Sequence, residues 1–367
     1  MGKRNDRQSK KKNIGIKILL LLLLITIAAA GAFFGYKYMN EDKTKEASTQ
    51  GISEENITPE PEPVKTVQIY AGTDRPIACM IDNHSDAWPQ FAINKAYAVY
   101  EIIVEGGETR LMAVFKGSDA DKVGPMRSSR HYFLDYALEN DAIYAHIGWS
   151  PQAQKDIKTL GVNNINGLEY DTGRAWKEGD VFWRLSNRYA PHNSICDLAT
   201  IKTAAASKGY RTTSDAKSIL NYTTDDVTLE ENTDAISATT VKIPFSNLQT
   251  VTFEYNAETG RYTRYARGKV QTDATDDTNI TTKNIIITKA ENYTLSDGEN
   301  KGRQGLKNTG TKDGYYITNG KAIPITCTKS DRSSKTVYKN ANGEEIKVND
   351  GNTFFEICPV DANITIQ

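Results

Sequence analysis

Cysteine is scarce in this chain of 367 residues, which has four cysteines and no CxxC pair. That absence argues against cysteine-built zinc and redox sites, and we expect neither a metal nor another cofactor. An even number of cysteines permits disulfides without requiring one. If a bridge forms, the sequence favours Cys327 with Cys358, which both fall in predicted C-terminal strands. Cys79 and Cys196 have the apolar neighbours of small buried residues.

A basic excess is also missing, and histidine is rare. The formal net charge is −1, and nucleic-acid binding needs a basic excess to neutralise phosphates, so we expect no nucleic-acid partner. The four histidines all lie between His84 and His192, and the second half of the chain has none. Loops that combine histidine with Asp, Asn or Arg are typical of functional sites, so we expect any ligand or chemistry in the first half.

The N-terminal residues predict a membrane anchor. Residues 1–17 are strongly basic and residues 18–35 carry no charge, a pattern typical of a transmembrane helix over residues 18–38 with a cytoplasmic tail. The alternative is a cleaved signal peptide, because Ala30-Gly31-Ala32 resembles a cleavage site, but the long apolar run favours the anchor. We therefore expect a single-pass protein of the cell membrane, with its N-terminus in the cytoplasm and its remaining domains outside.

The rest of the chain divides into a linker and two predicted domains. Residues 39–66 are polar, acidic and rich in proline, as in disordered linkers. An α/β (mixed α+β) domain over residues 67–210 and a mainly-β domain over residues 241–367 follow. The Thr-, Asp- and Ser-rich residues 211–240 between them are interpreted as the interdomain connection.

Local signals place helices and strands in the N-terminal domain. A buried strand is predicted over residues 76–81, and a hairpin joins residues 98–105 to 109–116 across Gly106-Gly107. A helix is predicted over residues 128–139 and a strand over 142–147. Two further helices begin at the N-cap residues Ser150 and Asp197 and end near residues 161 and 207.

Short strands with turn residues between them characterise the C-terminal domain. The clearest hairpin signal is Asn319-Gly320, between strands at residues 314–318 and 322–328. Regular short strands of this kind favour a small sandwich or barrel.

Polar residues follow the predicted strands at positions where α/β sheets build ligand sites. Arg127 and Arg130 fall in the first turn of the helix predicted at 128–139, where cations oppose the helix dipole, so an acidic partner is expected. That partner is Glu101, Glu105 or Asp135 within the protein, or an anionic ligand. The candidate ligand-binding residues are Asp82, Asn83, Glu105, Arg110, Arg127, Arg130, His146, His192 and Asn193.

Less specific interpretations of these residues stay open. A core histidine is as good an explanation of His146 as a site residue, and hydrogen-bonded loop scaffolding can explain both the pair His84 and Asn83 and the pair His192 and Asn193. A metal site at Asp82, His84, His146 and His192 is chemically possible, but no ligand spacing supports it. No G-x-S-x-G motif indicates a serine nucleophile.

Five motifs in the N-terminal half resemble one bacterial family. They are Met80-Ile81-Asp82-Asn83, Val104-Glu105-Gly106-Gly107-Glu108-Thr109-Arg110, Gly124-Pro125-Met126-Arg127-Ser128-Ser129-Arg130, Tyr144-Ala145-His146-Ile147-Gly148-Trp149-Ser150 and Arg188-Tyr189-Ala190-Pro191-His192-Asn193. In order and spacing they are similar to the YerB-like extracytoplasmic proteins of mostly Gram-positive bacteria, a family with domains of unknown function. A weaker resemblance covers residues 241–360, through Tyr262-Thr263-Arg264 and Lys283-Asn284-Ile285-Ile286-Ile287. The resemblance implies an extracytoplasmic two-domain protein and no particular activity.

Together these features favour a binding or scaffolding module of the cell envelope. Its N-terminal domain would offer a cleft in which arginines hold an anionic or sugar-containing ligand, while histidines and asparagines orient it. The alternative is a hydrolase of cell-wall polymers or phosphodiesters, with Asp82 or Glu105 as general base and His146 or His192 as acid. A purely structural role is the third possibility, and whether the chain is an enzyme stays open. The expected partners are the cytoplasmic membrane, through the N-terminal helix, and a cell-wall polymer or envelope protein.

Overall fold

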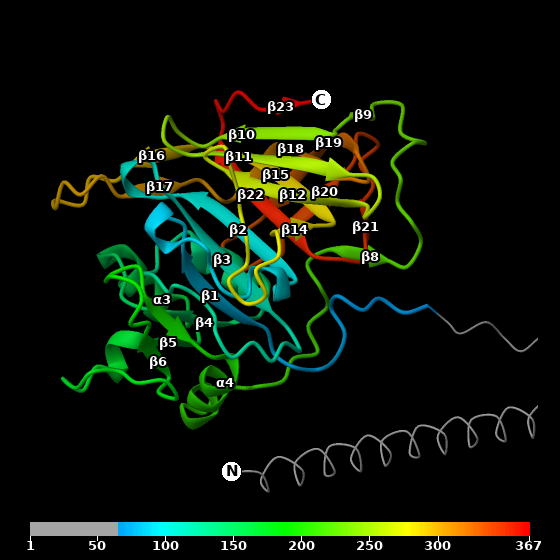
Figure 1. Cartoon of the computed structure of the whole chain (residues 1–367). Coiled ribbons are helices and arrows are strands. Elements are labelled where there is room, and N and C mark those ends of the chain that lie inside the picture. The colour runs from blue at the N-terminus through cyan, green and yellow to red at the C-terminus, as the bar shows by residue number, and fades with distance from the viewer. Residues whose placement is uncertain (1–64) are drawn as a thin grey trace, which may run out of the picture. The chain divides into compact units, whose positions relative to one another are not determined.

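The computed structural model describes residues 65–367 (Figure 1). The predicted cytoplasmic tail, the membrane anchor and the linker up to residue 64 lie outside the described residues. Within the described part of the chain, the structure contains no helix of the length and apolar character that crossing a bilayer requires.

A mixed sheet of 11 strands is the largest sheet of the structure. Ten of its strands follow one another in a single order, and the short strand β9 (Ile236–Ser237) pairs beside β19. In spatial order the ten are β20 (Val337–Lys339), β19 (Lys321–Lys329), β18 (Gly310–Thr318), β15 (Asn284–Ala290), β22 (Thr353–Pro359), β2 (Ala98–Ile103), β3 (Thr109–Phe115), β1 (Ile77–Asp82), β4 (Ile143–His146) and β5 (Asn164–Asn166).

The sheet joins the two halves of the chain. β22, near the C-terminus, pairs in parallel with β15 on one side and with β2 on the other. Figure 1 shows the blue-to-green N-terminal segments and the yellow-to-red C-terminal segments meeting along this line. The chain thus has a mixed α/β N-terminal region and a β-rich C-terminal region, and both belong to one compact unit.

β1 is an apolar run because both of its faces are buried. Cys79 and Ile81 point into the core on one side of the sheet, and Ala78 and Met80 into the core on the other. Strands covered on both faces lose the alternation of polar and apolar residues, which is why the sequence shows a continuous apolar run here. β1 has β3 as its antiparallel neighbour and β4 as its parallel neighbour.

A second sheet of six strands packs against the C-terminal part of the first. Phe253 of one sheet contacts Phe354 of the other, with ring centroids 5.6 Å apart. A separate small sandwich or barrel does not form, because the larger sheet continues into the N-terminal region through β22 and β2. The six strands are β13 (Lys269–Val270), β12 (Arg261–Ala266), β11 (Thr250–Asn256), β10 (Thr240–Pro244) and β23 (Thr365–Ile366), with β14 (Thr281–Thr282) beside β12.

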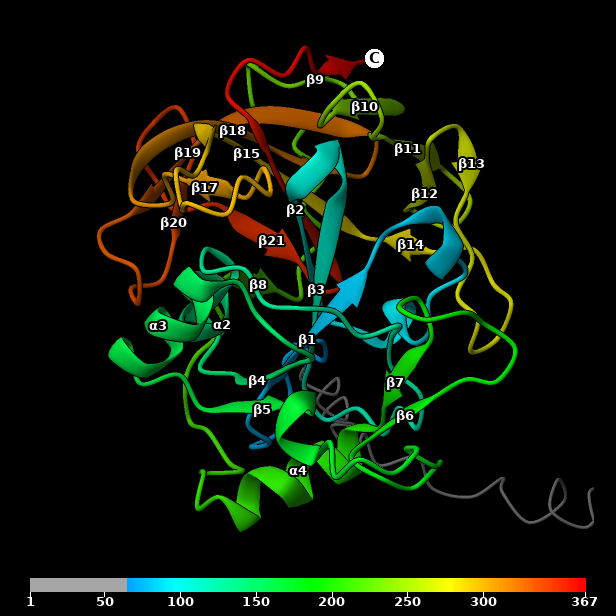
Figure 2. The same ribbon diagram turned by 90° about the vertical axis from the view of Figure 1, so that its left-hand side faces the viewer.

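The three α-helices of the described residues lie in the N-terminal region (Figure 2). α3 (Pro151–Thr159) begins as predicted, with the Ser150 hydroxyl accepting the backbone N–H of Ala153. α4 (Leu198–Ser207) also begins as predicted, with the Asp197 carboxylate accepting the backbone N–H of Thr200. These N-caps satisfy donors that the first helical turn leaves free.

The helix predicted over residues 128–139 is wrong in its first part, since α2 spans only Phe133–Glu139. Residues 127–130 are not helical, because their backbone groups bond to β1 and to the loop after β4. The N–H of Arg127 donates to the carbonyl of Met80, and the N–H of Ser129 donates to the carbonyl of Gly148. Arg127 and Arg130 therefore do not lie in the first turn of a helix, and the expected conflict with a helix dipole does not arise.

Short elements complete the fold. The predicted interdomain connection contains two short strands, β8 (Asn221–Thr223) and β9, and both pair with the C-terminal region. The remaining strand pairs are β6 (Phe182–Arg184) with β7 (Ser194–Cys196), β16 (Asn292–Thr294) with β17 (Gln304–Leu306), and β21 (Lys347–Asn349) with β8. The 3₁₀ turns are η1 (Ser85–Ala87), η2 (Ile93–Lys95), η3 (Glu105–Gly107) and η4 (Gly167–Tyr170).

The favoured disulfide is wrong, since all four cysteines are free and buried. Cys327 lies on β19 and Cys358 on β22, with β18 and β15 between them in the sheet. Their side chains also belong to cores on opposite faces of the sheet. Three strand spacings are about 14 Å, twice the reach of a disulfide.

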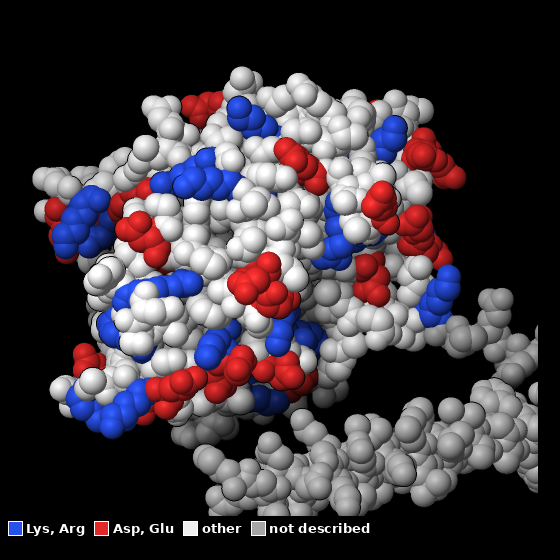
Figure 3. Space-filling model, viewed as in Figure 1, with Lys and Arg blue, Asp and Glu red and all other residues white. Residues whose placement is uncertain are grey.

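Charged residues are mixed on the surface. On the face seen in Figure 3, basic and acidic side chains lie beside one another rather than in separate areas. Charges of both signs at close spacing give this face little net field.

Candidate functional site

The carboxyl end of β1 brings together an acid, an arginine and a histidine from three separate loops. Asp82 Oδ2 lies 2.7 Å from His192 Nδ1 and 3.2 Å from Arg127 Nε. Asp82 Oδ1 accepts the backbone N–H of His84 at 3.0 Å. We call Asp82, His84, Arg127 and His192 the Asp82 site.

Backbone bonds hold these loops in place. Asp82 donates its N–H to the carbonyl of Pro125, and Arg127 donates its N–H to Met80, so the segment that carries Arg127 runs beside β1. Asn193, next to His192, accepts the N–H of Leu185 through its carbonyl. Its side-chain amide donates to the carbonyls of Leu185 and Arg188, which fixes the loop of His192.

The Asp82–His192 contact determines how the imidazole is presented. With Nδ1–H donating to the carboxylate, Nε2 is left as the acceptor of a neutral ring. The ring of His84 stacks on that of His192, with centroids 4.8 Å apart and planes 23° from parallel. Asp82 is buried, whereas 16% of the His192 side chain is exposed, so a buried acid orients a histidine that solvent can reach.

A second cluster of charges lies next to the Asp82 site. Arg130 makes a bidentate ion pair with Glu105, with distances of 2.5 and 2.9 Å. Arg110 lies opposite Asp82 in the β1–β3 register, donates to the carbonyl of Ser128 at 2.6 Å and is 3.9 Å from Glu105 Oε2. The segment containing Arg127 and Arg130 thus connects the two clusters.

The electrostatics of this region favour a negative partner. Burial and the neighbouring Arg130 lower the pKa of Arg110 to about 10, so the guanidinium stays charged at neutral pH. Burial alone would raise the pKa of Glu105, but the hydrogen bond and charge of Arg130 bring it below its ordinary value. Among residues 65–367, Arg110, Arg127 and Arg130 form ion pairs with two carboxylates, Asp82 and Glu105, which leaves one excess positive charge.

The structure places the other three sequence candidates inside the protein. His146 is fully buried and bonded to the carbonyl of Gly148 and to Asn164, and burial lowers its pKa to about 4. Asn83 is fully buried and donates to Glu101 and Thr109. Asn193 supports the His192 loop as described above. These residues hold the scaffold, while the other six candidates form the two charged clusters.

A buried network behind Asn83 was not predicted as a unit. Glu101 Oε2 lies 2.6 Å from Arg264 Nη2, and Glu101 Oε1 accepts the amides of Asn83 and Gln249 and the hydroxyl of Thr109. Arg264, on β12, is fully buried, as is Glu356 on β22. An isolated arginine in a β-rich stretch gives no signal of such burial, although Tyr262-Thr263-Arg264 is one of the family motifs.

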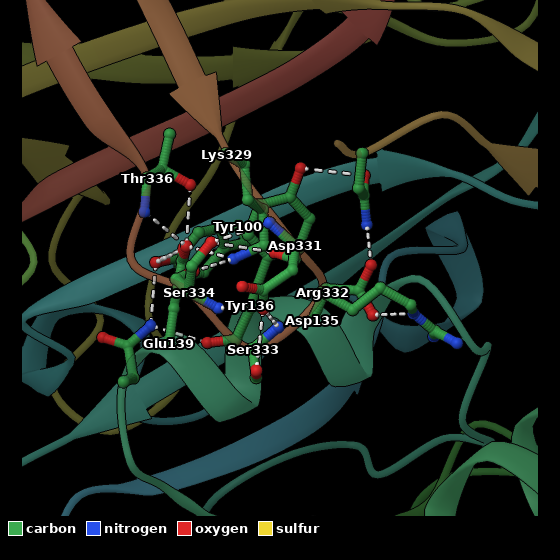
Figure 4. A network of polar contacts seen from close by, with 12 residues as sticks. Tyr100, Asp135, Tyr136, Glu139, Lys329, Asp331, Arg332, Ser333, Ser334 and Thr336 are labelled. Carbon is green, nitrogen blue, oxygen red and sulfur yellow. Dashed lines mark hydrogen bonds and ion pairs between the residues drawn. The ribbon is translucent and has the colours of Figure 1, made fainter. Parts of the chain in front are cut away.

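Asp135, one of the acidic partners expected for Arg127 and Arg130, binds a different arginine. Figure 4 shows this network between α2 and the turn after β19. Asp135 Oδ1 lies 2.7 Å from Arg332 Nε, and Arg332 Nη1 lies 2.6 Å from Asp156 Oδ2. Burial outweighs the charge of Arg332 and raises the pKa of Asp135 to about 6.

Two family models match the chain along these elements. Residues 64–211 match the description "Protein of unknown function (DUF3048) N-terminal domain", and residues 241–355 match the corresponding C-terminal domain. The chain belongs to the DUF3048 family. The Asp82 site lies wholly within the N-terminal DUF3048 domain, and the boundary between the two DUF3048 domains falls in the segment that contains β8 and β9.

Two comparisons concern the same DUF3048 relative. The chain is 30% identical over 280 residues to a Bacillus subtilis (strain 168) protein described as "Putative lipoprotein YerB", covering 76% of each chain. It is also similar to the crystal structure of the YerB protein from Bacillus subtilis, with a TM-score of 0.70 and 28% identity, covering 82% of this chain and 97% of that one. The predicted resemblance to a two-domain YerB-like family is thereby confirmed.

Proposed function

We propose that this chain is a membrane-anchored extracytoplasmic protein of the Gram-positive cell envelope that binds an anionic, sugar-containing polymer. The binding surface is the Asp82 site together with Arg110, Arg130 and Glu105. The relative named as a lipoprotein and the uncharged run at residues 18–35 both support attachment to the outer side of the membrane.

The observation that carries the proposal is the state of Arg127. Its Nε is buried 3.2 Å from Asp82, yet no acceptor among the described residues satisfies the geometry of a hydrogen bond to it. About a quarter of the Arg127 side chain is exposed. A phosphate or carboxylate group bound at the exposed part of the Arg127 side chain would neutralise the excess charge of the three arginines.

The test is a thermal-shift titration of the full chain in detergent with a glycosylated glycerol phosphate polymer, using a neutral glucan as the reference. Chelator is present throughout, so metal ions play no part. We expect the polymer to raise the unfolding midpoint, because a ligand that binds only the folded state stabilises it by about 2.7 kcal/mol at a hundredfold excess over Kd. The neutral glucan is expected to leave the midpoint unchanged.

Arg127→Gln removes the guanidinium and should abolish the rise of the unfolding midpoint with the polymer. Arg303→Gln is the matched control, because Arg303 is also paired with carboxylates but belongs to the turn between β16 and β17. A shift that survives Arg127→Gln, or an equal shift with the neutral glucan, would refute the proposal.

One observation favours a second candidate, a hydrolase of wall polymers or phosphodiesters. The 2.7 Å contact between Asp82 and His192 is the arrangement in which a carboxylate orients a histidine for general acid–base work. His192 Nε2 would accept or deliver the proton, and Arg127 would stabilise developing negative charge. Release of phosphate or reducing sugar that His192→Gln abolishes, while polymer binding persists, would establish this activity. Binding without turnover would leave the binding function alone.

A further inference from the structure

His84, Asp86 and His192 present three potential metal ligands on one side of the Asp82 site. One side-chain donor atom from each lies within 4.8 Å of the other two. His84 is the N-cap residue of η1 and Asp86 lies within η1, while His192 comes from the loop between β6 and β7.

The spacing of the first two donors fits a shared ion better than a direct bond. His84 Nδ1 and Asp86 Oδ2 are 3.6 Å apart, which is too long for a hydrogen bond. Two ligands at about 2.1 Å from one tetrahedral ion are separated by about 3.4 Å. The backbone N–H of Asp86 donates to the same nitrogen at 3.2 Å, so an ion would replace one weak hydrogen bond.

The third donor already has the supporting contact that metal-binding histidines use. His192 donates Nδ1–H to the buried Asp82 carboxylate at 2.7 Å, which fixes the tautomer in which Nε2 has a free lone pair. A carboxylate behind the imidazole orients the ring and makes Nε2 a stronger ligand. The imidazole rings of His84 and His192 stack on each other, which keeps the two histidines side by side.

The charge of Asp86 is available for a cation. Its side chain is 68% exposed, and among the described residues its ion-pair contact is His84 rather than a lysine or arginine. Asp82 is already paired with Arg127. Asp86 therefore offers the ligand oxygen, whereas Asp82 orients His192.

We propose that His84 Nδ1, Asp86 Oδ2 and His192 Nε2 bind a divalent transition-metal ion, zinc in the first instance. Two imidazoles and one carboxylate form a ligand set that suits zinc, whereas magnesium and calcium prefer sets made of oxygen ligands alone. Three protein ligands leave a fourth position open, as in sites where the metal contacts a ligand or a water molecule. The metal site does not depend on polymer binding, although it shares His192 with the proposed anion site.

The direct test is calorimetric titration of the full chain in detergent, freed of metal by chelator and carrying no polyhistidine tag, with zinc chloride alone. We expect one zinc ion per chain and no heat with magnesium chloride. Cobalt(II) in place of zinc should produce the visible absorption of a tetrahedral site. No saturable zinc binding below about 100 μM would overturn the proposal.

Variants locate the ion. His84→Ala and Asp86→Asn should each weaken zinc binding at least tenfold, and Asp86→Asn, at an exposed position, should leave the unfolding midpoint without metal unchanged. Asp82→Asn should weaken it by about 10- to 100-fold, since it removes the support behind His192. His131→Gln, which removes a histidine outside the site, is the control and should bind zinc as the natural chain does. Unaltered binding by both His84→Ala and Asp86→Asn would place the metal elsewhere and refute the assignment.

Zinc titrations without polymer, and polymer titrations in chelator, keep the two proposals apart. Loss of polymer binding with zinc binding intact would refute only the proposed function. Loss of zinc binding with polymer binding intact would refute only the metal site.

Discussion

Glu101 and Glu356 lie directly opposite each other on the adjacent parallel strands β2 and β22. Both are fully buried, and a single guanidinium, that of Arg264, pairs with Glu101. Neither carboxyl oxygen of Glu356 has a hydrogen-bond partner among the described residues. β2 lies in the N-terminal DUF3048 domain and β22 begins at the end of the C-terminal one, so an incompletely satisfied charge cluster lies where the two halves of the chain share one sheet.

Glu356→Gln should stabilise the protein at neutral and alkaline pH. Burial and the neighbouring Glu101 raise the pKa of Glu356 well above its ordinary value of 4.5, so the folded state holds this proton more tightly than the unfolded chain does. The natural protein therefore loses stability as pH rises above about 4.5 towards the folded pKa, by about 1.4 kcal/mol per pH unit. Glutamine cannot titrate and removes this loss. Urea unfolding at pH 5 and pH 8 measures it, and the gain should be larger at pH 8.

The control for this experiment is Glu344→Gln, which changes an exposed glutamate. We expect it to have the same small effect at both pH values. A stability difference between Glu356→Gln and the natural chain that is independent of pH would contradict a protonated Glu356.

Lys329→Met should destabilise the protein by about 3–5 kcal/mol, because it leaves a buried carboxylate without its cation. Lys329 Nζ lies 2.8 Å from Glu139 Oε2, and both side chains are almost completely buried (Figure 4). Combining Lys329→Met with Glu139→Gln should recover part of the loss, since no uncompensated charge remains. Denaturant unfolding of the two single variants and the double variant gives the coupling energy.

Lys307→Met is the matched control for the buried pair. Lys307 forms an ion pair with Glu291 in which more than half of each side chain is exposed. Solvent screens such pairs, so its removal should cost less than about 1 kcal/mol. Equal losses for Lys307→Met and Lys329→Met would show that burial of the Lys329 pair has no special role.

His146→Asn should reduce the loss of stability in acid. Burial lowers the pKa of His146 to about 4 from its ordinary 6.5, so the unfolded chain takes up this proton first as the pH falls. The natural protein therefore loses about 3 kcal/mol through this residue between pH 6.5 and pH 4. The variant is less stable at pH 7 because packing and hydrogen bonds are lost, and its deficit should shrink towards pH 4. A deficit that stays constant over this range would exclude a buried neutral imidazole.

Thiol labelling should find four cysteines in the unfolded chain and none in the native one. All four thiols are buried, and burial raises the pKa of Cys327 and Cys358 to about 12, which suppresses the reactive thiolate. Mass spectrometry after iodoacetamide treatment, without reductant, measures the number of labels in buffer and in urea. Two labels in urea rather than four would reveal a disulfide.

Elements with strong local signals could be predicted from the sequence. The apolar run of β1, the hairpin around Gly106-Gly107 and the capped starts of α3 and α4 all appear where their residues indicate. The apolar run of β1 reflects burial on both of its faces. The hairpin and the two helix starts depend on contacts within a few residues of the chain, such as the hydroxyl of Ser150 with the N–H of Ala153. Such contacts are visible in the sequence because the two partners are neighbours.

Local signals failed for the first part of the helix predicted at residues 128–139. Its apolar spacing fits a helix, but the backbone donors of Arg127 and Ser129 bond instead to β1 and to the loop after β4. Long-range backbone bonding overrides weak local helix propensity. The same limit explains the cysteines, because sequence spacing does not show that Cys327 and Cys358 lie on opposite faces of a sheet.

The sequence by itself determined the family, the kinds of secondary structure and the half of the chain in which the histidines lie. Only the tertiary structure decided that His192 contacts Asp82, that Arg264 joins Glu101, and that one sheet runs through both halves. The physical reason is that these contacts join residues 110 and 163 positions apart. Their energies depend on burial and distance, which the chain acquires only when β1, β2 and β22 lie side by side in the folded sheet.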